Sequence, residues 1–302
     1  MSLITIFTAP KPFTDPHIAL IQHNAIRSWL ALGEQVEVIL LGEEEGLAEA
    51  AALYGVRHLP QVQRTPAGTP LVSSMFALAQ EHSTSPLLCC VNADILLTPD
   101  LLTVGQTMLE RYARFLVVGQ RWDLDVREPL DFSSGWAERL RQRVQQEGKL
   151  HKATGSDYFL FPRGCFTDMP AFAIGRAGWD NWMIYSGRAQ GFPVVDATHD
   201  LFIVHQNHDY RHLPGGQPHY KHPETLENVR LAGGRRAIFE LPDVSHRLVN
   251  GKLVRPPLTW QRFWREVEIF PLVKWHSYPL ALGMYFLLHP KKAYREYREG
   301  RL

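Results

Sequence analysis

The sequence has few of the features that mark secreted, membrane-spanning or nucleic-acid-binding proteins. Only 3 of its 302 residues are cysteine, and 32 lysines and arginines are balanced by 31 aspartates and glutamates, which gives a net charge of +1. Because there is no general positive field to attract nucleic acid, such binding would require a local basic patch. We therefore expect no nucleic-acid partner.

The scarce cysteines indicate a reducing compartment. Cys89 and Cys90 are neighbours in an apolar run, and adjacent residues of a strand point to opposite faces, so they are poor disulfide partners. The three cysteines also lack the spacing of a metal site. The first residues begin a strand and have neither the basic nor the long apolar region of a secretory signal peptide. These features predict a cytoplasmic protein.

Long hydrophobic runs are also missing, although apolar residues make up 45% of the chain. The apolar run at 280–288 is well short of the ~20 residues that a membrane span needs. The wider window 269–288 is interrupted by Pro271, Lys274, His276 and Pro279. We expect this region to pack on the protein or to lie at an interface.

Strand-like and helix-like segments alternate in the first part of the chain. Buried strands are expected at 3–8, 36–41, 56–59, 87–91 and 115–119. Helical spacing of apolar residues is found at 17–32, 46–54, 70–81 and 99–112. This alternation predicts an α/β protein with a mostly parallel central sheet flanked by helices.

The second part of the chain is less regular. Residues 123–151 are polar and are expected to form an insertion over the sheet edge, with a helix at about 136–146. Further strands are expected at 158–162, 194–196 and 201–205, and a helix at 181–190. Residues 206–255 are rich in histidine, proline and glycine, which predicts loops, and long loops in compact domains are often functional lids.

One candidate site follows the buried strand at 87–91. Asn92-Ala93-Asp94 would lie at the carboxyl end of this strand, where open α/β sheets bind ligands. The Asp94 carboxylate suits a hard cation such as Mg²⁺ or Mn²⁺, and Asn92 could hold a ribose or a diphosphate beside it. An apolar strand followed by aspartate is common in α/β proteins, so a simple polar turn is the alternative.

A second carboxylate, Asp180, stands between Trp179 and Trp182 at the start of a predicted helix. Asp180 suits a general base, and the flat tryptophan rings suit stacking on a sugar. The alternative is that Asp180 caps the helix and that the tryptophans belong to the core. Asp157 precedes the strand at 158–162 and could contact substrate hydroxyls, with turn formation as an equal alternative.

His205 suits a second metal ligand that a later strand supplies, and His208 is the alternate. A single histidine is more often an ordinary core or loop residue. Other histidines in this region make a zinc site conceivable, but no cysteine accompanies them and their spacing matches no usual zinc pattern; they are His199, His212, His219 and His222.

Taken together, these segments resemble the GT-A superfamily of glycosyltransferases, and more narrowly the bacterial enzymes of the family-2 type. The resemblance covers about residues 3 to 245 and rests on ITIFTAPK, GTPLVSSMF, VNADILL, GSDYFLFPRG, FAIGRAGWDNWMIY and VHQNHDY. It implies a GT-A, Rossmann-like fold and the transfer of a sugar from a nucleoside diphosphate to an acceptor hydroxyl. It also implies assistance by Mn²⁺ or Mg²⁺.

The resemblance assigns a role to each candidate. The family's metal aspartate corresponds to Asp94, its catalytic base to Asp180, and its metal histidine to His205 or, less well, His208. The first acid of the family's DxD pattern is replaced by Asn92, so metal binding would rest on Asp94. Further nucleotide-side positions are Thr8, Ala9 and Lys11 after the first strand, and Thr69 and Ser73 in GTPLVSSMF.

The implied organisation is a catalytic domain over 1–257 and an aromatic, basic helical extension over 258–302. The catalytic domain would contain a nucleotide half at about 1–120 and an acceptor half at about 152–257. Within the extension, Trp260, Phe263, Trp264 and Val267 recur at helical spacing. Such a helix suits either packing on the catalytic domain or contact with a membrane surface, in which case the acceptor would be a lipid-linked glycan.

Two other functions fit part of the pattern. A nucleotidyltransferase uses a similar sheet and cation, but it usually has a glycine-rich loop after the first strand, and residues 8–12 contain no glycine. A non-catalytic nucleotide- or glycan-binding module is favoured by Asn92 and opposed by Asp180 between two tryptophans. We expect an inverting transferase in which Asp180 deprotonates the acceptor hydroxyl.

Overall fold

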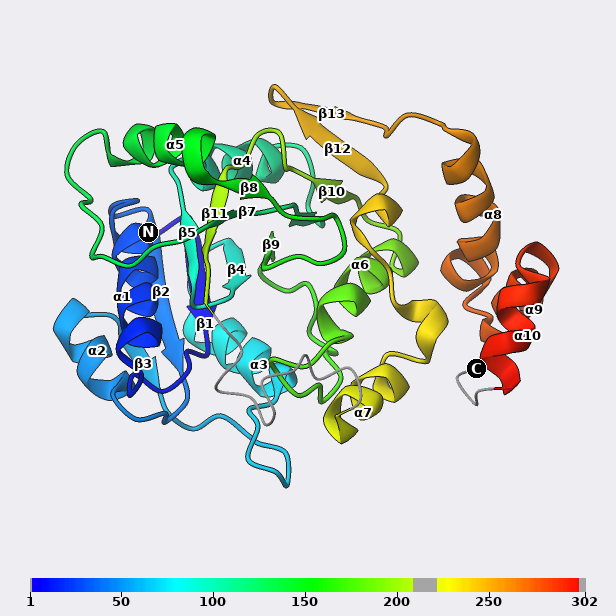
Figure 1. Ribbon diagram of the computed structural model, residues 1–302, viewed down its shortest axis with the longest axis horizontal. Coiled ribbons are helices and arrows are strands. Elements are labelled where there is room, and N and C mark those ends of the chain that lie inside the picture. Colours follow the sequence, from blue (N-terminus) through cyan, green and yellow to red (C-terminus); the bar gives the residue numbers. More distant parts are fainter. Residues whose placement is uncertain (1, 209–221, 299–302) are drawn as a thin grey trace.

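A computed structural model describes residues 2–208 and 222–298 of the chain. Over these residues the protein contains a nine-stranded and a four-stranded sheet. The order of the larger sheet is β13-β12-β10-β6-β9-β4-β1-β2-β3, and that of the smaller sheet is β5-β11-β7-β8. Helices flank the larger sheet, and Figure 1 shows the C-terminal helices at the opposite end of the molecule from α1 and α2.

The secondary structure elements have the following bounds. The larger sheet contains β1 (Ile4–Thr8), β2 (Val36–Leu41), β3 (Arg57–Leu59), β4 (Leu87–Val91), β6 (Leu116–Val118), β9 (Tyr158–Pro162), β10 (Val194–Asp196), β12 (His246–Val249) and β13 (Lys252–Val254). The smaller sheet contains β5 (Ile95–Leu97), β7 (Trp122–Leu124), β8 (Lys149–Leu150) and β11 (Ile203–Gln206). The helices are α1 (Pro16–Leu30), α2 (Leu47–Tyr54), α3 (Val72–His82), α4 (Asp100–Leu109), α5 (Trp136–Glu147), α6 (Trp179–Ala189), α7 (Pro223–Leu231), α8 (Trp260–Trp275), α9 (Tyr278–Leu288) and α10 (Pro290–Arg298).

The larger sheet is mostly parallel, which confirms the predicted fold class. β1 pairs in parallel with both β2 and β4, whereas β9 and β13 are antiparallel to their neighbours. The chain proceeds outward from β1 through β2 and β3 and then returns to the other side of β1 as β4. Ligands of open α/β sheets bind at such a reversal of strand order, beyond the carboxyl ends of the strands.

Alternate residues of β1 belong to two cores on opposite faces of the sheet. Ile4 and Ile6 pack in one core with residues of α1 and α4, and Phe7 packs in the other with residues of α3 and α6. This division follows from the two-residue repeat of a strand. Packing on both faces fixes β1 and β4, so the loops that follow these strands are anchored at the carboxyl ends of the two strands.

The prediction of loops over 206–255 is wrong for much of that segment. Its described part contains α7, two short 3-10 helices (Arg235–Ala237 and Leu241–Asp243), and the hairpin β12–β13, which extends the larger sheet. Asn250-Gly251 forms the hairpin turn with positive φ angles at both residues, which is a sequence signal for a hairpin. His212 and His219 lie outside the described residues.

The segment 123–151 contains the predicted helix, but it does more than cover a sheet edge. β7 and β8 flank α5 in sequence, and both join β5 and β11 in the smaller sheet. β7 runs parallel to β11 and antiparallel to β8. The segment is therefore part of the scaffold that positions the strand bearing His205.

Helices α8, α9 and α10 pack in sequence against one another, and α8 also contacts α6. They account for most of the extension that was expected after residue 257. Among the described residues, no helix combines the length and apolar character that crossing a membrane requires.

Trp29 holds α1 against β5, because its side chain is fully buried and its Nε1–H donates to the Ile95 carbonyl at 3.0 Å. Trp29→Phe removes this donor and leaves a small cavity. We expect the free energy of unfolding to fall by about 2–4 kcal/mol, measured by urea denaturation. The control Trp260→Phe, at a residue that is 74% exposed, should change it little. Equal stability of the two variants would contradict the assignment.

Candidate active site

Asp94 lies in the turn between β4 and β5, at the carboxyl end of β4. The Asp94 carbonyl accepts a hydrogen bond from the Gln206 backbone N–H at 3.1 Å, which ties the turn to the end of β11. β11 lies between β5 and β7, in a register that places His205 opposite both Ile95 and Asp123. The smaller sheet therefore brings His205 beside Asp94 although the two residues are far apart in sequence.

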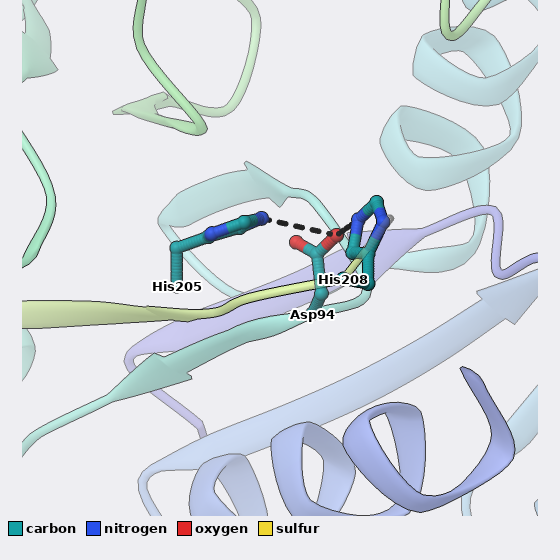
Figure 2. A group of neighbouring side chains, drawn as sticks. All are labelled: Asp94, His205 and His208. Atoms are coloured by element: carbon teal, nitrogen blue, oxygen red, sulfur yellow. Dashed lines mark hydrogen bonds and ion pairs between the residues drawn. The ribbon is translucent and has the colours of Figure 1, made fainter. Parts of the chain in front are cut away.

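The Asp94 carboxylate lies between two imidazole rings, as Figure 2 shows. Asp94 Oδ2 is 3.1 Å from His208 Nε2 and 3.7 Å from His205 Nε2. The three candidate ligand atoms all lie within 4.8 Å of one another. This confirms that the three residues predicted to bind metal lie together.

The donor chemistry of this cluster fits a divalent cation. Two imidazole nitrogens and a carboxylate oxygen suit ions such as Mn²⁺ or Zn²⁺. Asp94 Oδ1 is buried and has no hydrogen-bond partner among the described residues. A buried carboxylate oxygen without a partner is unfavourable for the stability of the folded protein. A cation bound next to this oxygen would give it a partner and remove this unfavourable feature of the site.

Neighbouring side chains favour the ionised form of Asp94. Burial raises the pKa of Asp94, but His205, the hydrogen bond with His208 and the charge of Lys11 together lower this pKa well below its usual value. Lys11 extends from the loop after β1, and its Nζ is 3.4 Å from His208 Nε2. Burial lowers the pKa of Lys11, and the charge of Asp94 opposes this effect. The loops after β1 and β4 thus meet at the cation cluster.

Asp123 faces the other ring nitrogen of His205, on the side away from Asp94. Its Oδ1 lies 3.4 Å from His205 Nδ1, and its Oδ2 lies 2.6 Å from His151 Nδ1. Burial raises the pKa of Asp123, but His205, His151 and Arg121 lower it to well below its usual value. A carboxylate behind a metal-binding histidine fixes the orientation of its ring. The sequence analysis did not identify Asp123, because its segment was interpreted only as a polar insertion.

Arg121 connects this cluster to Asp157, which precedes β9. Its Nε donates to Asp123 Oδ1 at 3.0 Å, and its Nη1 pairs with Asp157 Oδ1. Asn92 Nδ2 also donates to Asp157 Oδ1, at 2.9 Å. Asn92 thus holds Asp157 through its amide group, which has the donor that a carboxylate at this position would lack. Arg121 is a second site residue that the sequence analysis did not identify.

Asp180 lies in the first turn of α6, and its Oδ1 accepts a hydrogen bond from the Gly178 backbone N–H at 3.2 Å. Burial raises the pKa of Asp180 to about 6, against the opposing effect of backbone N–H groups. The charge of Asp157 adds to the increase. Asp180 is therefore electrostatically coupled to Asp157, which Arg121 joins to the cation cluster. A carboxylate with this pKa is mostly ionised at neutral pH and is a better base than an ordinary aspartate.

The two tryptophans beside Asp180 have different environments. Trp179 is only 6% exposed, and its ring packs at 5.1 Å against that of Phe159. This burial places Trp179 in the core, as the alternative interpretation of the sequence has it, rather than on a surface where a sugar could stack. Trp182 is partly exposed and contacts Phe172 edge-on, so it is the better candidate for acceptor binding.

The other predicted nucleotide-side residues are spread over three elements. Thr8 is buried at the end of β1, and Ala9 follows it in the loop that leads to Lys11. The Thr69 hydroxyl donates to Glu224 Oε2 at 3.0 Å, which links its loop to α7. Ser73 lies in the first turn of α3. The contacts of these residues do not connect Thr69 or Ser73 to the cation cluster, and their role in nucleotide binding stays a prediction.

No protein-family model matches this chain, and no curated protein matches it. Solved structures do match. Glucosyl-3-phosphoglycerate synthase from Mycobacterium tuberculosis, in complex with Mn²⁺, UDP and glucosyl-3-phosphoglycerate, has 14% identity and a TM-score of 0.48, over 86% of this chain and 88% of that one. The mannosyltransferase PcManGT from Pyrobaculum calidifontis, in complex with GDP-Man and Mn²⁺, has 12% identity and a TM-score of 0.44, over 76% of this chain and 62% of that one.

A third match is S. aureus TarS 1-349 in complex with UDP-GlcNAc, with 12% identity and a TM-score of 0.32. The match covers 42% of this chain and 36% of the TarS chain. With TM-scores below 0.5, these similarities do not establish what this protein binds or does. Its function has to be inferred from the geometry of its own site.

Asp123→Asn tests the support of His205. The substitution preserves shape but removes the negative charge behind the ring, so we expect the affinity for Mn²⁺ to fall about 10- to 100-fold, measured by isothermal titration calorimetry. Asp125→Asn is the matched control, because Asp125 is exposed and lies just beyond the same strand. An unchanged affinity in Asp123→Asn would show that Asp123 does not orient a ligand.

Proposed function

We propose that this protein transfers a glycosyl group from a nucleoside diphosphate sugar to an acceptor hydroxyl. Mn²⁺ or Mg²⁺ would be held by Asp94, His205 and His208. The observation that supports this proposal is the connection of a cation-binding cluster to a carboxylate of raised pKa, Asp180, through adjacent charged groups. The cluster lies where the strand order reverses, which is the ligand-binding crevice of open α/β sheets.

The donor would bind between the loops after β1 and β4. A bound cation would neutralise the negative charge that develops on the departing diphosphate. Lys11 places a second positive charge at the same position, and hydrogen bonds between its backbone and the Gln22 side chain of α1 hold its loop in place. The backbone of residues 8–11 would then lie beside the nucleoside.

The acceptor would bind on the side of Asp180. Its hydroxyl would donate to the Asp180 carboxylate and lose its proton as the oxygen attacks the anomeric carbon. Attack opposite to the diphosphate in a single displacement inverts the configuration at this carbon. Trp182 and Asp157 would orient the acceptor, which we propose to be a glycan or a lipid-linked glycan.

The metal donor set alone does not select this function, because a carboxylate and two histidines also suit Zn²⁺ or Fe²⁺. Asp180 supports a transferase over a binding module, since a module does not require a base of raised pKa. A binding module would be recognised by nucleotide binding without turnover.

Two substitutions separate binding from chemistry. Incubation of the protein with UDP-, GDP-, CMP- and dTDP-sugars and Mn²⁺ should give transfer or slow hydrolysis with one nucleotide class. In Asp94→Ala, the rise in melting temperature that this nucleotide and Mn²⁺ cause should disappear. In Asp180→Asn, the rise should persist while turnover falls about 100-fold or more. Full turnover in Asp180→Asn would exclude Asp180 as the base.

The pH dependence of turnover should follow Asp180. The base is active only when it is ionised, and its pKa is raised from 3.8 to about 6. We therefore expect kcat/KM to increase with pH up to about 6 and to level off above it. Asp157→Asn removes a charge that raises this pKa, so its acid limb should move to lower pH. An acid limb near pH 4 in the unsubstituted protein would contradict the assignment.

A further inference from the structure

The outer face of the C-terminal helices is unusually apolar. Helix α8 packs on the protein through Glu268, Ile269, Leu272 and Val273, which are buried. The rest of its surface carries large aromatic side chains that are exposed by 39–74%: Trp260, Phe263, Trp264, Phe270 and Trp275. Exposed apolar patches of this kind mark sites of interaction with proteins or membranes.

Helices α9 and α10, which follow α8 and pack beside it, also carry exposed apolar side chains and positive charge. Leu280 and Leu287 of α9 and Tyr294 and Tyr297 of α10 are more than half exposed. Exposed cations lie among these side chains: Lys274, Lys291, Lys292, Arg295 and Arg298. Within residues 2–208 and 222–298, none of these cations forms an ion pair with a carboxylate.

All carboxylates of the described part of the extension instead face the body of the protein. Glu266 pairs with Arg188 of α6 at 2.8 Å. Glu268 and Glu296 both pair with Arg236, whose guanidinium lies 3.7 Å from the centre of the Tyr285 ring. These contacts attach α8, α9 and α10 to the rest of the chain. They also separate the charges, because the acids pair with the body of the protein, whereas the exposed cations have no carboxylate partner among the described residues and only Lys292 lies over a ring, that of Tyr285.

We propose that the outer face of α8–α10 docks on the surface of an anionic lipid bilayer. Tryptophan and tyrosine rings favour the boundary between headgroups and acyl chains. Lysine and arginine beside them are attracted to anionic headgroups. A second copy of the chain fits this surface less well, since a symmetric interface would bring the same cations together. This proposal does not depend on the proposed glycosyl transfer, because the surface lies on elements separate from the cation cluster.

The test is flotation of the full-length protein with vesicles of phosphatidylcholine, alone or mixed with phosphatidylglycerol. We expect the protein to float with the mixed vesicles at least about tenfold more than with pure phosphatidylcholine, and to be released by high salt. Lys291→Glu/Lys292→Glu and Trp260→Ser/Trp275→Ser should each reduce this binding about tenfold or more.

Two control variants match these changes at other exposed positions. Arg111→Glu/Lys252→Glu alters the net charge equally, and Leu53→Ser/Leu226→Ser removes exposed apolar side chains from α2 and α7. Both should bind the mixed vesicles as the unsubstituted protein does, and all variants should have the same melting temperature. The proposal is overturned if the protein does not float with the mixed vesicles, or if the control variants lose as much binding as the test variants. It is also overturned if no variant binds vesicles and light scattering shows a dimer that only the test substitutions dissociate.

Discussion

The stability of an ionised carboxylate at Asp94 is the constraint on which the site depends. Removing a carboxylate from water is unfavourable unless charges and hydrogen bonds of the protein replace its hydration. Here Lys11 replaces it from the loop after β1, and His205 and His208 replace it from the end of β11 and the residues that follow. The pairing of β11 with β5 and β7 positions His205, and His208 lies two residues beyond the end of β11.

Among the described residues, the charged groups around Asp94 form a chain with more acidic than basic members. The acidic members are four aspartates that lie in succession through the site: Asp94, Asp123, Asp157 and Asp180. The basic members are Lys11, which acts on Asp94, and Arg121, which contacts Asp123 and Asp157. A divalent cation at Asp94 would correct this imbalance at one end. At the other end, the excess of negative charge contributes to the raised pKa of Asp180, which is the property that a general base requires. The same shortage of cations thus favours metal binding and base function together.

The sequence contained the strongest signals for residues that end buried strands. Leu87–Val91 is apolar without interruption and is followed at once by polar residues, so both β4 and the position of Asp94 could be predicted. Asp180 and His205 were likewise proposed from their local context, and their roles stay predictions. Asp123 and Arg121 were not found, because their function arises from the register of β7 with β11, a non-local pairing that no short motif reports.

The hairpin β12–β13 was missed despite its Asn250-Gly251 signal, since the surrounding composition suggested loops. Trp179 shows the opposite limit, because sequence alone does not distinguish a tryptophan that stacks on a ligand from one that packs on Phe159.

The central claim is that Asp94, His205 and His208 hold one divalent cation. Its most direct test is a crystal structure of the protein with Mn²⁺ and a nucleoside diphosphate, with anomalous diffraction recorded at the manganese absorption edge. The account predicts one anomalous peak within bonding distance of Asp94, His205 and His208, with the diphosphate completing its coordination. A crystal in which manganese is absent from this cluster, or is bound elsewhere while the nucleotide occupies the crevice, would contradict it.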